Sequence, residues 1–286
     1  MPKIGFIGAG TVGTALAIRL TEQGYAVVAV ASRSRASAEK LADRIIHCCV
    51  AEKSQEVARL ADLVFITTPD DVIASVANAV QWRPGQMVVH CNGSASTDIL
   101  ENARRSGALV GSFHPLQTFA DVAEAIRNLP GSAFAIEAEE PLHDLLAQMA
   151  RDLGGQSFGL RAEDKVLYHA AAVIASNYTV ALMKMATDLW RGFGVPVAQA
   201  TQALLPLLRG TVNNIDKIGL PNCLTGPIAR GDVGTLRNHL NALRERAPDM
   251  IDAYRQLGLQ AIPIALEKGR ILQETAREMK ALLEGR

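Results

Sequence analysis

Apolar and polar positions follow two different periods in the first half of the chain. Short apolar runs, each closed by a turn residue, predict strands, and apolar residues repeated every three to four positions predict helices. The predicted strands cover residues 3–8, 26–31, 63–67, 86–91, 109–113, 133–137 and 156–160. The predicted helices between them cover residues 11–23, 37–44, 70–80, 97–105 and 141–153. This alternation is typical of the α/β class and predicts a doubly wound parallel sheet with helices on both faces.

The second half shows helical periodicity and almost no strand pattern. The predicted helices cover residues 164–193, 197–218, 233–244 and 249–257, with more helix towards the C-terminus. Gly194 and Pro196 end the first of them. We therefore expect an α/β domain over residues 1–160 and an all-helical domain over residues 161–286. A length of 286 residues fits two domains of ordinary size.

The composition excludes several classes of protein. Apolar residues make up 49% of the chain and charged residues 20%, which excludes a disordered tail, a collagen and a coiled-coil rod. The 29 Lys and Arg residues balance 29 Asp and Glu residues, so we expect neither a nucleic acid nor a membrane as partner. The mean hydropathy of +0.12 is slightly apolar, which indicates either surface buried between subunits or a large core.

Cysteine usage and the apolar segments favour a cytoplasmic protein. Cys48, Cys49, Cys91 and Cys223 form no C-x-x-C pair and have no metal-ligand spacing, so we expect reduced thiols and no metal site. The N-terminus is broken by glycines and has no small-residue cleavage site, so we expect no signal peptide. The most apolar run, residues 170–185, is interrupted by polar side chains and is too short for a membrane span.

A glycine-rich turn follows the first strand. Gly8, Gly10 and Gly13 form the pattern G-x-G-x-x-G where that strand ends and a helix begins. In dinucleotide-binding folds the first glycine makes the turn, the second lets the backbone approach a pyrophosphate, and the third lets the helix pack on the strand. Thr11 and Val12 open the helix, whose free N–H groups favour phosphates. The turn predicts a dinucleotide site; the alternative is a glycine turn that binds nothing.

The end of the second strand indicates which dinucleotide binds. NAD sites usually carry Asp or Glu there, whereas this chain has Ser32, Arg33, Ser34 and Arg35, with no acid before Glu39. Guanidinium groups pair with phosphate oxygens and serine hydroxyls donate hydrogen bonds to them, so the turn favours the 2′-phosphate of NADP. An ordinary solvated basic turn is the alternative.

Two further segments follow strands and are expected at the carboxyl edge of the sheet, where open α/β sheets bind ligands. These segments are Thr67-Thr68-Pro69 and Asn92-Gly93-Ser94. We expect the first segment, with Asn92 and Gly93, to contact the cofactor, and Ser94 to contact the substrate. Either segment is also compatible with a turn that caps the next helix.

His114 is a candidate catalytic residue. It follows another strand and precedes Pro115, which holds it extended at the strand end. Histidine donates a proton or polarises a carbonyl near neutral pH. Gln117, a neutral hydrogen-bonding residue three positions later, is a candidate substrate ligand. The alternative is a histidine packed at the strand tip.

The helix that begins near residue 164 carries polar side chains on an apolar background. Lys165 and His169 share one of its faces, and Asn177 is rotated further round. Buried polar groups need partners, and a ligand is one kind of partner. An enclosed lysine serves as a general acid, so Lys165 and His169 are candidate catalytic residues and Asn177 a candidate substrate ligand. The alternative is a lysine at the rim and core polar groups that satisfy one another.

A constrained loop over residues 224–232 interrupts the helical half. Arg230 is a candidate partner for a substrate carboxylate, and Thr225 a candidate hydrogen-bond donor to it. The alternative is an interhelical loop in which Arg230 pairs with Asp232.

The segments G-A-G-T-V-G and S-R-S resemble the NADP-binding domain shared by pyrroline-5-carboxylate reductases, ketopantoate reductases, β-hydroxyacid dehydrogenases and deazaflavin-linked NADP oxidoreductases. H-P-L-Q-T-F resembles the segment of prephenate dehydrogenases whose histidine is catalytic, and His114 is the matching residue. With Y-H-A-A-A-V-I-A-S-N-Y and L-T-G-P-I-A-R-G-D, nearly the whole chain resembles a bacterial family that joins a Rossmann-like domain to a helical domain of formerly unknown function. This resemblance implies dimerisation through the helical domain and an alternative ketopantoate reductase activity.

Two departures leave the substrate open. Ketopantoate reductases carry Asn one helical turn after their Lys, where this chain has His169 after Lys165. The S-P-G-G-T signature of pyrroline-5-carboxylate reductases is replaced by L-T-G-P. We expect an NADPH-dependent oxidoreductase that transfers a hydride to a small carboxylate-bearing carbonyl compound, with ketopantoate as the leading substrate. The alternatives are a cyclic imine reductase, a deazaflavin-linked oxidoreductase and an NADP(H)-binding sensor without turnover.

Overall fold

The computed structural model describes residues 1–285, which form two compact units. The first unit covers Met1–Ser176 and the second begins at Asn177. All described strands lie in the first unit, and the last of them ends at Gly159. The predicted fold class, an α/β domain followed by a helical region, is confirmed. The helix that begins at Lys165 belongs to the first unit, which therefore extends past residue 160.

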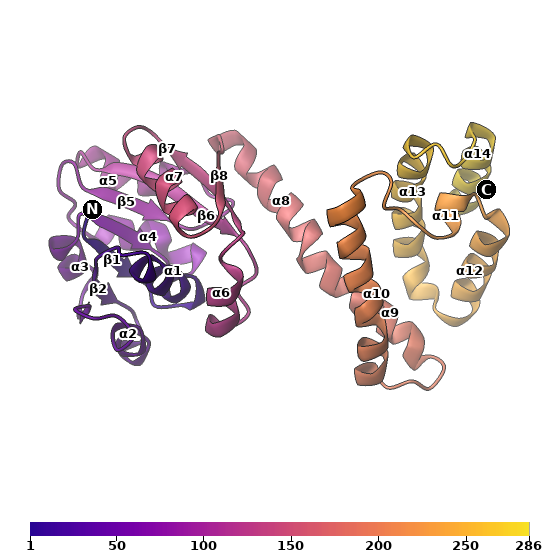
Figure 1. The fold of residues 1–286 in the computed structure, drawn as a ribbon, viewed down its shortest axis with the longest axis horizontal. Coiled ribbons are helices and arrows are strands. Elements are labelled where there is room, and N and C mark those ends of the chain that lie inside the picture. The colour runs from indigo at the N-terminus through magenta and orange to yellow at the C-terminus, as the bar shows by residue number, and fades with distance from the viewer. Residues whose placement is uncertain (286) are drawn as a thin grey trace. The chain divides into compact units, whose positions relative to one another are not determined.

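One eight-stranded sheet organises the first unit (Figure 1). Its strands are β1 (Ile4–Ile7), β2 (Val27–Ala31), β3 (Cys49–Val50), β4 (Leu63–Ile66), β5 (Met87–His90), β6 (Leu109–Leu116), β7 (Ala133–Ala138) and β8 (Gln156–Gly159). The order across the sheet is β3-β2-β1-β4-β5-β6-β7-β8. The winding direction changes between β1 and β4, and open α/β sheets bind ligands at the carboxyl edge of such a switch point.

One strand pair corrects the expected parallel sheet. Strands β6 and β7 are antiparallel, with Leu116 opposite Ala133, so their connection begins and ends at the same edge of the sheet. Helix α6 (Val122–Asn128) in that connection packs on α1 (Thr11–Glu22) instead of crossing to the opposite edge. The prediction of a fully parallel sheet is therefore wrong. An apolar run indicates that a strand is buried but carries no information about its direction.

Helices cover both faces of this sheet (Figure 1). Helices α1, α2 and α7 share one apolar core with the sheet, and helices α3, α4 and α5 share the other. Their bounds are α2 (Arg35–Ala42), α3 (Ser54–Leu60), α4 (Ile73–Ala79), α5 (Glu101–Arg105) and α7 (Leu142–Asp152), followed by α8 (Lys165–Ala175). Single turns of 3-10 helix precede α4, α5 and α8 at Asp70–Val72, Thr97–Leu100 and Ala162–Asp164. Strand β3 and helices α3 and α6 were not predicted, because two to seven residues are too few for a clear period.

Phenylalanine rings from four strands form a continuous row in the first core. The ring centroids of Phe6 and Phe65 are 5.2 Å apart, those of Phe65 and Phe113 6.1 Å, and those of Phe113 and Phe134 4.7 Å. All four side chains are fully buried. The row joins the parallel strands to the antiparallel β7, so it stabilises the part of the sheet that carries His114.

The second unit is built from helices only, within the described residues. They are α9 (Asn177–Arg191), α10 (Val197–Ile218), α11 (Pro227–Arg230), α12 (Val233–Arg246), α13 (Ile251–Glu267) and α14 (Gln273–Glu284), with a 3-10 turn at Pro248–Met250. Apolar side chains, most of them from α12, α13 and α14, form its core. The predicted helix over 164–193 is divided at Ser176, where the backbone leaves the regular helical conformation.

The segment Ala162–Arg191 is the one stretch of the described chain that is long and apolar enough to cross a membrane, by length and composition only. None of its most apolar window is buried inside the structure. A single stretch of this kind also occurs in soluble proteins as a helix that packs against other protein, so its composition alone assigns no membrane.

We expect Phe113→Ala to lower the free energy of unfolding of the first unit by about 3–5 kcal/mol, because it opens a cavity in the phenylalanine row. Trp82 is buried and its indole N–H donates to the Ala77 carbonyl, so its fluorescence reports on this unit. Urea unfolding is followed in a Trp190→Phe background, where Trp82 is the sole tryptophan. Phe158→Ala, at a ring that is 39% exposed, is the matched control and costs about 1 kcal/mol or less. Equal losses in the two variants would contradict this account of the core.

Candidate active site

The glycine turn after β1 has no room for side chains. A Cβ on Gly8 would lie 2.6 Å from the Thr67 carbonyl, and Gly8 has a φ of +114°. A Cβ on Gly13 would lie 2.3 Å from the Thr67 hydroxyl and 2.5 Å from the Gly8 carbonyl oxygen. The same hydroxyl donates a hydrogen bond of 2.8 Å to that oxygen, which ties the end of β4 to the turn. Gly10 precedes α1 and no side chain caps this helix, so Thr11 and Val12 begin it with free N–H groups.

A cavity of about 710 Å3 lies over this turn. The predicted cofactor residues that line it are Gly8, Gly10, Ser32, Arg33, Ser34, Thr67, Thr68 and Pro69. Its wall also includes Glu52 and Lys53, which sequence reasoning missed because their loop follows the unpredicted strand β3. The Thr68 hydroxyl is buried without a hydrogen-bond partner in the described structure. A buried hydroxyl of this kind needs a partner, which a bound polar ligand can supply.

The predicted cofactor residue Arg35 does not line this cavity. Arg35 is the first residue of α2, and its Nε donates a hydrogen bond of 2.8 Å to Glu39. A second guanidinium nitrogen lies 3.9 Å from Glu52. The Ser34 hydroxyl accepts a hydrogen bond from the Ser37 N–H and so caps α2.

A second group of polar side chains forms where α8 meets the ends of β5 and β6. The His114 Nδ1 and the Tyr168 hydroxyl lie 2.7 Å apart, and the ring of His169 stands at a steep angle to that of His114. Gly93 makes this approach possible, because a Cβ there would lie 2.7 Å from His114 Nε2 and 2.9 Å from the His169 ring. We call His114, Tyr168, His169 and Gly93 the histidine cluster.

Burial keeps His114 and Tyr168 uncharged. Desolvation, assisted by His169 and Lys165, lowers the pKa of His114 to about 4, and burial raises the pKa of Tyr168 to about 12. Both groups are therefore neutral around pH 7, and they hold protons for hydrogen bonding without net charge. Tyr168 was not predicted as a site residue, although its place three positions after Lys165 puts it on the same helix face.

Lys165 is tied to the sheet. Its side chain is 2% exposed, and its ammonium group donates hydrogen bonds of 2.7 Å to the Ser112 hydroxyl and 3.0 Å to a Glu137 carboxylate oxygen. The other Glu137 oxygen accepts hydrogen bonds from the N–H and hydroxyl of Thr97. Burial lowers the pKa of Lys165, while Glu137 opposes this shift. The predicted residue Lys165 is thus a buried, paired cation. Its partner Glu137, the last residue of a predicted strand, was not predicted as a site residue.

Three predicted residues are engaged by their own loops. The Asn92 side-chain oxygen accepts hydrogen bonds from the N–H groups of Ser94 and Ala95, at 2.7 and 2.6 Å, and from the Ser94 hydroxyl. The Gln117 side chain donates to the Asn128 carbonyl and to the Ser132 hydroxyl. These bonds give the two loops a fixed shape.

Three predicted substrate ligands belong to the second unit. Asn177 begins α9, Thr225 precedes α11, and Arg230 is the last residue of α11. Asp232, the alternative partner of Arg230, accepts hydrogen bonds from the N–H and hydroxyl of Thr235 and caps α12.

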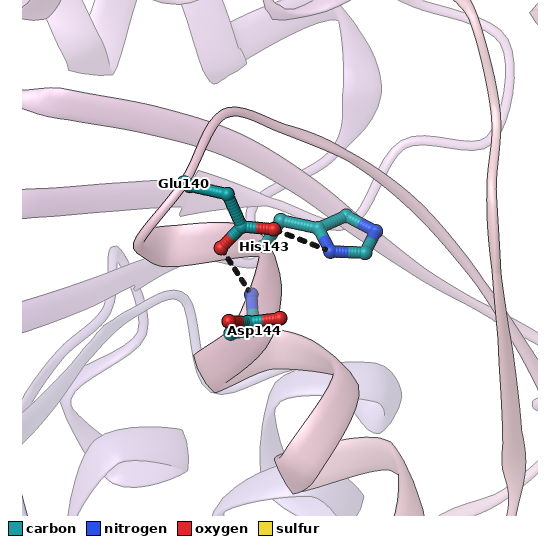
Figure 2. A group of neighbouring side chains, drawn as sticks. All are labelled: Glu140, His143 and Asp144. Carbon is teal, nitrogen blue, oxygen red and sulfur yellow. Dashed lines mark hydrogen bonds and ion pairs between the residues drawn. The ribbon is translucent and has the colours of Figure 1, made fainter.

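Glu140, His143 and Asp144 stand close together at the start of α7 (Figure 2). One Glu140 oxygen accepts a hydrogen bond of 3.2 Å from the Asp144 N–H, and the other lies 3.3 Å from His143 Nδ1. Both carboxylates are exposed. The group is explained by the start of α7, where the Glu140 carboxylate accepts a hydrogen bond from a free N–H of the first turn.

Comparisons with known proteins agree with this fold. Residues 2–115 match the family model of a Rossmann-like domain, and residues 132–261 match that of the domain of unknown function DUF2520. The chain therefore joins a Rossmann-like domain to a DUF2520 region, and the resemblance inferred from the sequence is confirmed. The second match begins at Ser132, so it includes β7, α7 and β8 as well as helices of the second unit. No curated protein matches the chain.

Solved structures with the same fold cover almost the whole chain. A protein from Thermotoga maritima is 25% identical over 93% of this chain and 100% of its own, with a TM-score of 0.75. A provisionally assigned NADP oxidoreductase from Bacteroides fragilis is 25% identical over 92% and 98%, with a TM-score of 0.70. A pyrroline carboxylate reductase from Plasmodium falciparum, solved with NADP bound, is 15% identical over 94% and 97%, with a TM-score of 0.59. At 15% identity, the likeness to the Plasmodium falciparum protein shows a shared fold and nothing more.

The low pKa of His114 predicts a loss of stability in acid. Between about pH 6.5 and pH 4 the unfolded chain binds a proton that the folded His114 does not, so the free energy of unfolding falls as the pH falls through this window. We expect this contribution to be on the order of 1–3 kcal/mol. Urea unfolding over a pH series measures it. His114→Gln makes the dependence less steep, and the part that remains includes His90, whose pKa burial lowers to about 3. An NMR titration of the His114 ring with a midpoint near pH 6.5 would contradict the burial argument.

Proposed function

We propose that the chain is an NADPH-dependent reductase of a small carboxylate-bearing carbonyl compound. The observation that carries this proposal is the glycine turn without room for side chains, beneath a cavity whose far end presents Ser32, Arg33 and Ser34. The unpartnered Thr68 hydroxyl in the same cavity fits a polar ligand. The names of the Bacteroides fragilis and Plasmodium falciparum proteins support NADP as that ligand.

When bound, NADPH would supply a hydride, and groups of the chain would bind the cofactor and supply a proton. The N–H groups at the start of α1 would hold the pyrophosphate, and Gly10, which has no side chain, would allow its close approach. Near pH 7 the neutral His114 ring carries one proton and the Tyr168 hydroxyl carries one, and one of these two protons forms the hydrogen bond between Nδ1 and the hydroxyl. Reduction of a carbonyl would leave an alkoxide, which is a stronger base than a phenolate. In this proposal the Tyr168 hydroxyl gives the alkoxide a proton, and water returns a proton to the tyrosinate that remains.

Lys165 supports the histidine cluster, of which His169 is a member, in this proposal. The hydrogen bonds of Lys165 to Ser112 and Glu137 fix the first turn of α8, and with it the positions of Tyr168 and His169. A lysine held in this way also raises the electrostatic potential at the site, which favours charge that develops on a substrate oxygen. In this proposal Lys165 assists the reaction while its ammonium group stays paired with Glu137.

As candidate substrate ligands we propose, in the second unit by itself, Arg230 and Thr225 for a carboxylate and Asn177 as a neutral hydrogen-bonding group. In the first unit by itself we propose Ser94 and Gln117 as neutral hydrogen-bonding groups. Arg230 is supported by the chemistry of a guanidinium with a carboxylate and by the use of Asp232 as a helix cap. Ketopantoate is the leading compound to test. A cyclic imine is the second candidate, favoured by the whole-chain fold likeness to a pyrroline carboxylate reductase.

A panel of 2-oxo acids, including ketopantoate, and cyclic imines tests the reaction through the loss of NADPH absorbance. We expect turnover with one compound class, and we expect His114→Phe to lower kcat by roughly 10²–10⁴-fold with little change in NADPH affinity. His143→Phe, outside the site, is the matched control. NADPH binding without any turnover would favour the sensor reading, and turnover only with an added deazaflavin would favour that cofactor chemistry. Absence of NADPH binding would overturn the proposal.

We also propose that the chain is a cytoplasmic homodimer formed through its helical half. Large apolar side chains of α9 and α10 are exposed in the chain by itself: Tyr178, Val180, Leu182, Leu189, Leu207, Val212, Ile215 and Ile218. A surface of this kind is typical of an interface with another protein. The four cysteines are free thiols, which supports a reducing compartment.

Sedimentation of the purified chain tests the dimer. We expect the wild type to sediment as twice 30.6 kDa, and Val212→Asp to shift the protein towards the monomer, because a charge in an apolar interface has no partner. Ile46→Asp, at an exposed apolar residue of the first unit, makes the same chemical change and leaves the mass unaltered. A monomeric wild type would contradict the proposal.

A further inference from the structure

Two loops meet at the end of the cavity that lies beyond the glycine turn. Strand β3 pairs in parallel with β2, and the Ala51 N–H donates to the Val30 carbonyl at 2.8 Å, so both strands end at the same edge. The turn after β2 brings Arg33 to the cavity wall, and the loop after β3 brings Glu52 and Lys53 to the same wall. These are separate parts of the sequence, twenty residues apart.

Of the three cations in these two loops, one is paired with carboxylates of the described chain and two are not. Arg35 donates to Glu39 at 2.8 Å and lies 3.9 Å from Glu52, so its single positive charge is shared between two carboxylates. The Glu52 backbone N–H donates to Glu56 at 2.9 Å, which orders the loop ahead of α3. Within residues 1–285, Arg33 and Lys53 make no ion pair. Two unpaired cations therefore line one end of the cavity, and the third cation of the region is occupied.

We infer that Lys53 and Arg33 together select NADPH over NADH by binding the 2′-phosphate, and that Arg35 acts by offsetting part of the negative charge of Glu52. This inference rests on the proposed NADPH dependence and adds a residue to it. A phosphate monoester carries nearly two negative charges near pH 7, so cations from two loops match it better than one. Lysine binds phosphate as a point charge and arginine binds it through paired N–H groups.

The function of Arg35 follows from the position of Glu52. A free carboxylate on the cavity wall would repel the 2′-phosphate, since like charges at short range are unfavourable. Arg35 lies beside this carboxylate and outside the cavity lining. It therefore suppresses the repulsion without touching the ligand, and it is a positioning residue in this account.

Dissociation constants of NADPH and NADH, measured by calorimetry on the full chain, test the inference. We expect Lys53→Gln and Arg33→Gln each to weaken NADPH binding about tenfold or more and to change NADH binding less than about twofold. Lys3→Gln, an exposed lysine away from the cavity lining, is the matched control and changes neither constant. Lys53 is exposed, so its replacement leaves the core intact, and the thermal midpoint of each variant checks this.

A double variant separates Arg35 from the two binding cations. We expect Arg35→Gln to weaken NADPH binding, and Glu52→Gln added to it to restore binding to within about twofold of wild type. Unchanged NADPH binding in Lys53→Gln, or an equal loss for NADPH and NADH, would overturn the role of Lys53. Failure of Glu52→Gln to restore binding would overturn the role of Arg35. A wild type that binds neither dinucleotide would instead overturn the proposed function.

Discussion

The buried ion pair between Lys165 and Glu137 is the interaction on which the candidate site depends. A lysine ammonium out of contact with water is tolerated only when charged and polar partners surround it. Those partners are Ser112 of β6 and Glu137 of β7, which lie directly opposite each other in the antiparallel ladder. The change of strand direction at β7 therefore creates the site that holds Lys165. Because Lys165 is the first residue of α8, the pair also fixes where Tyr168 and His169 begin their approach to His114.

The regular alternation of apolar runs was enough to predict most elements of the first unit. It was weakest where an element was too short to show a period, as at β3 with two residues, and where direction mattered, as at β7. The long helix after residue 160 was predicted in type, and its division at Ser176 was not, because the apolar pattern runs through that point without a Gly or Pro. Periodicity reports which side of an element is buried, whereas direction and breaks depend on contacts made by distant residues.

In the candidate site, too, features set by neighbouring residues were predicted, and contacts between distant residues were not. The glycine turn could be predicted because the spacing of its glycines reflects steric demands within a few neighbouring residues. In the structure, Gly8 and Gly13 both lie against Thr67. The pairing of Lys165 with Glu137 was not readable, since 28 residues separate the two and no local pattern marks a buried carboxylate. Tyr168 was overlooked for a related reason. An aromatic residue on an apolar helix reads as core until its hydroxyl is seen beside His114.

Strand β6 continues past its parallel neighbour. Its pairing with β5 stops at Ser112 opposite His90, while its pairing with β7 continues to Leu116. His114 therefore stands on a projecting length of strand that is bonded on one side and open on the other. The backbone of this histidine is fixed by the ladder during folding, so no loop has to be ordered around it when a ligand arrives. The overhang carries the half-buried imidazole on rigid backbone beyond the parallel ladder, so binding of a ligand at this position would cost less conformational entropy than binding by a mobile loop.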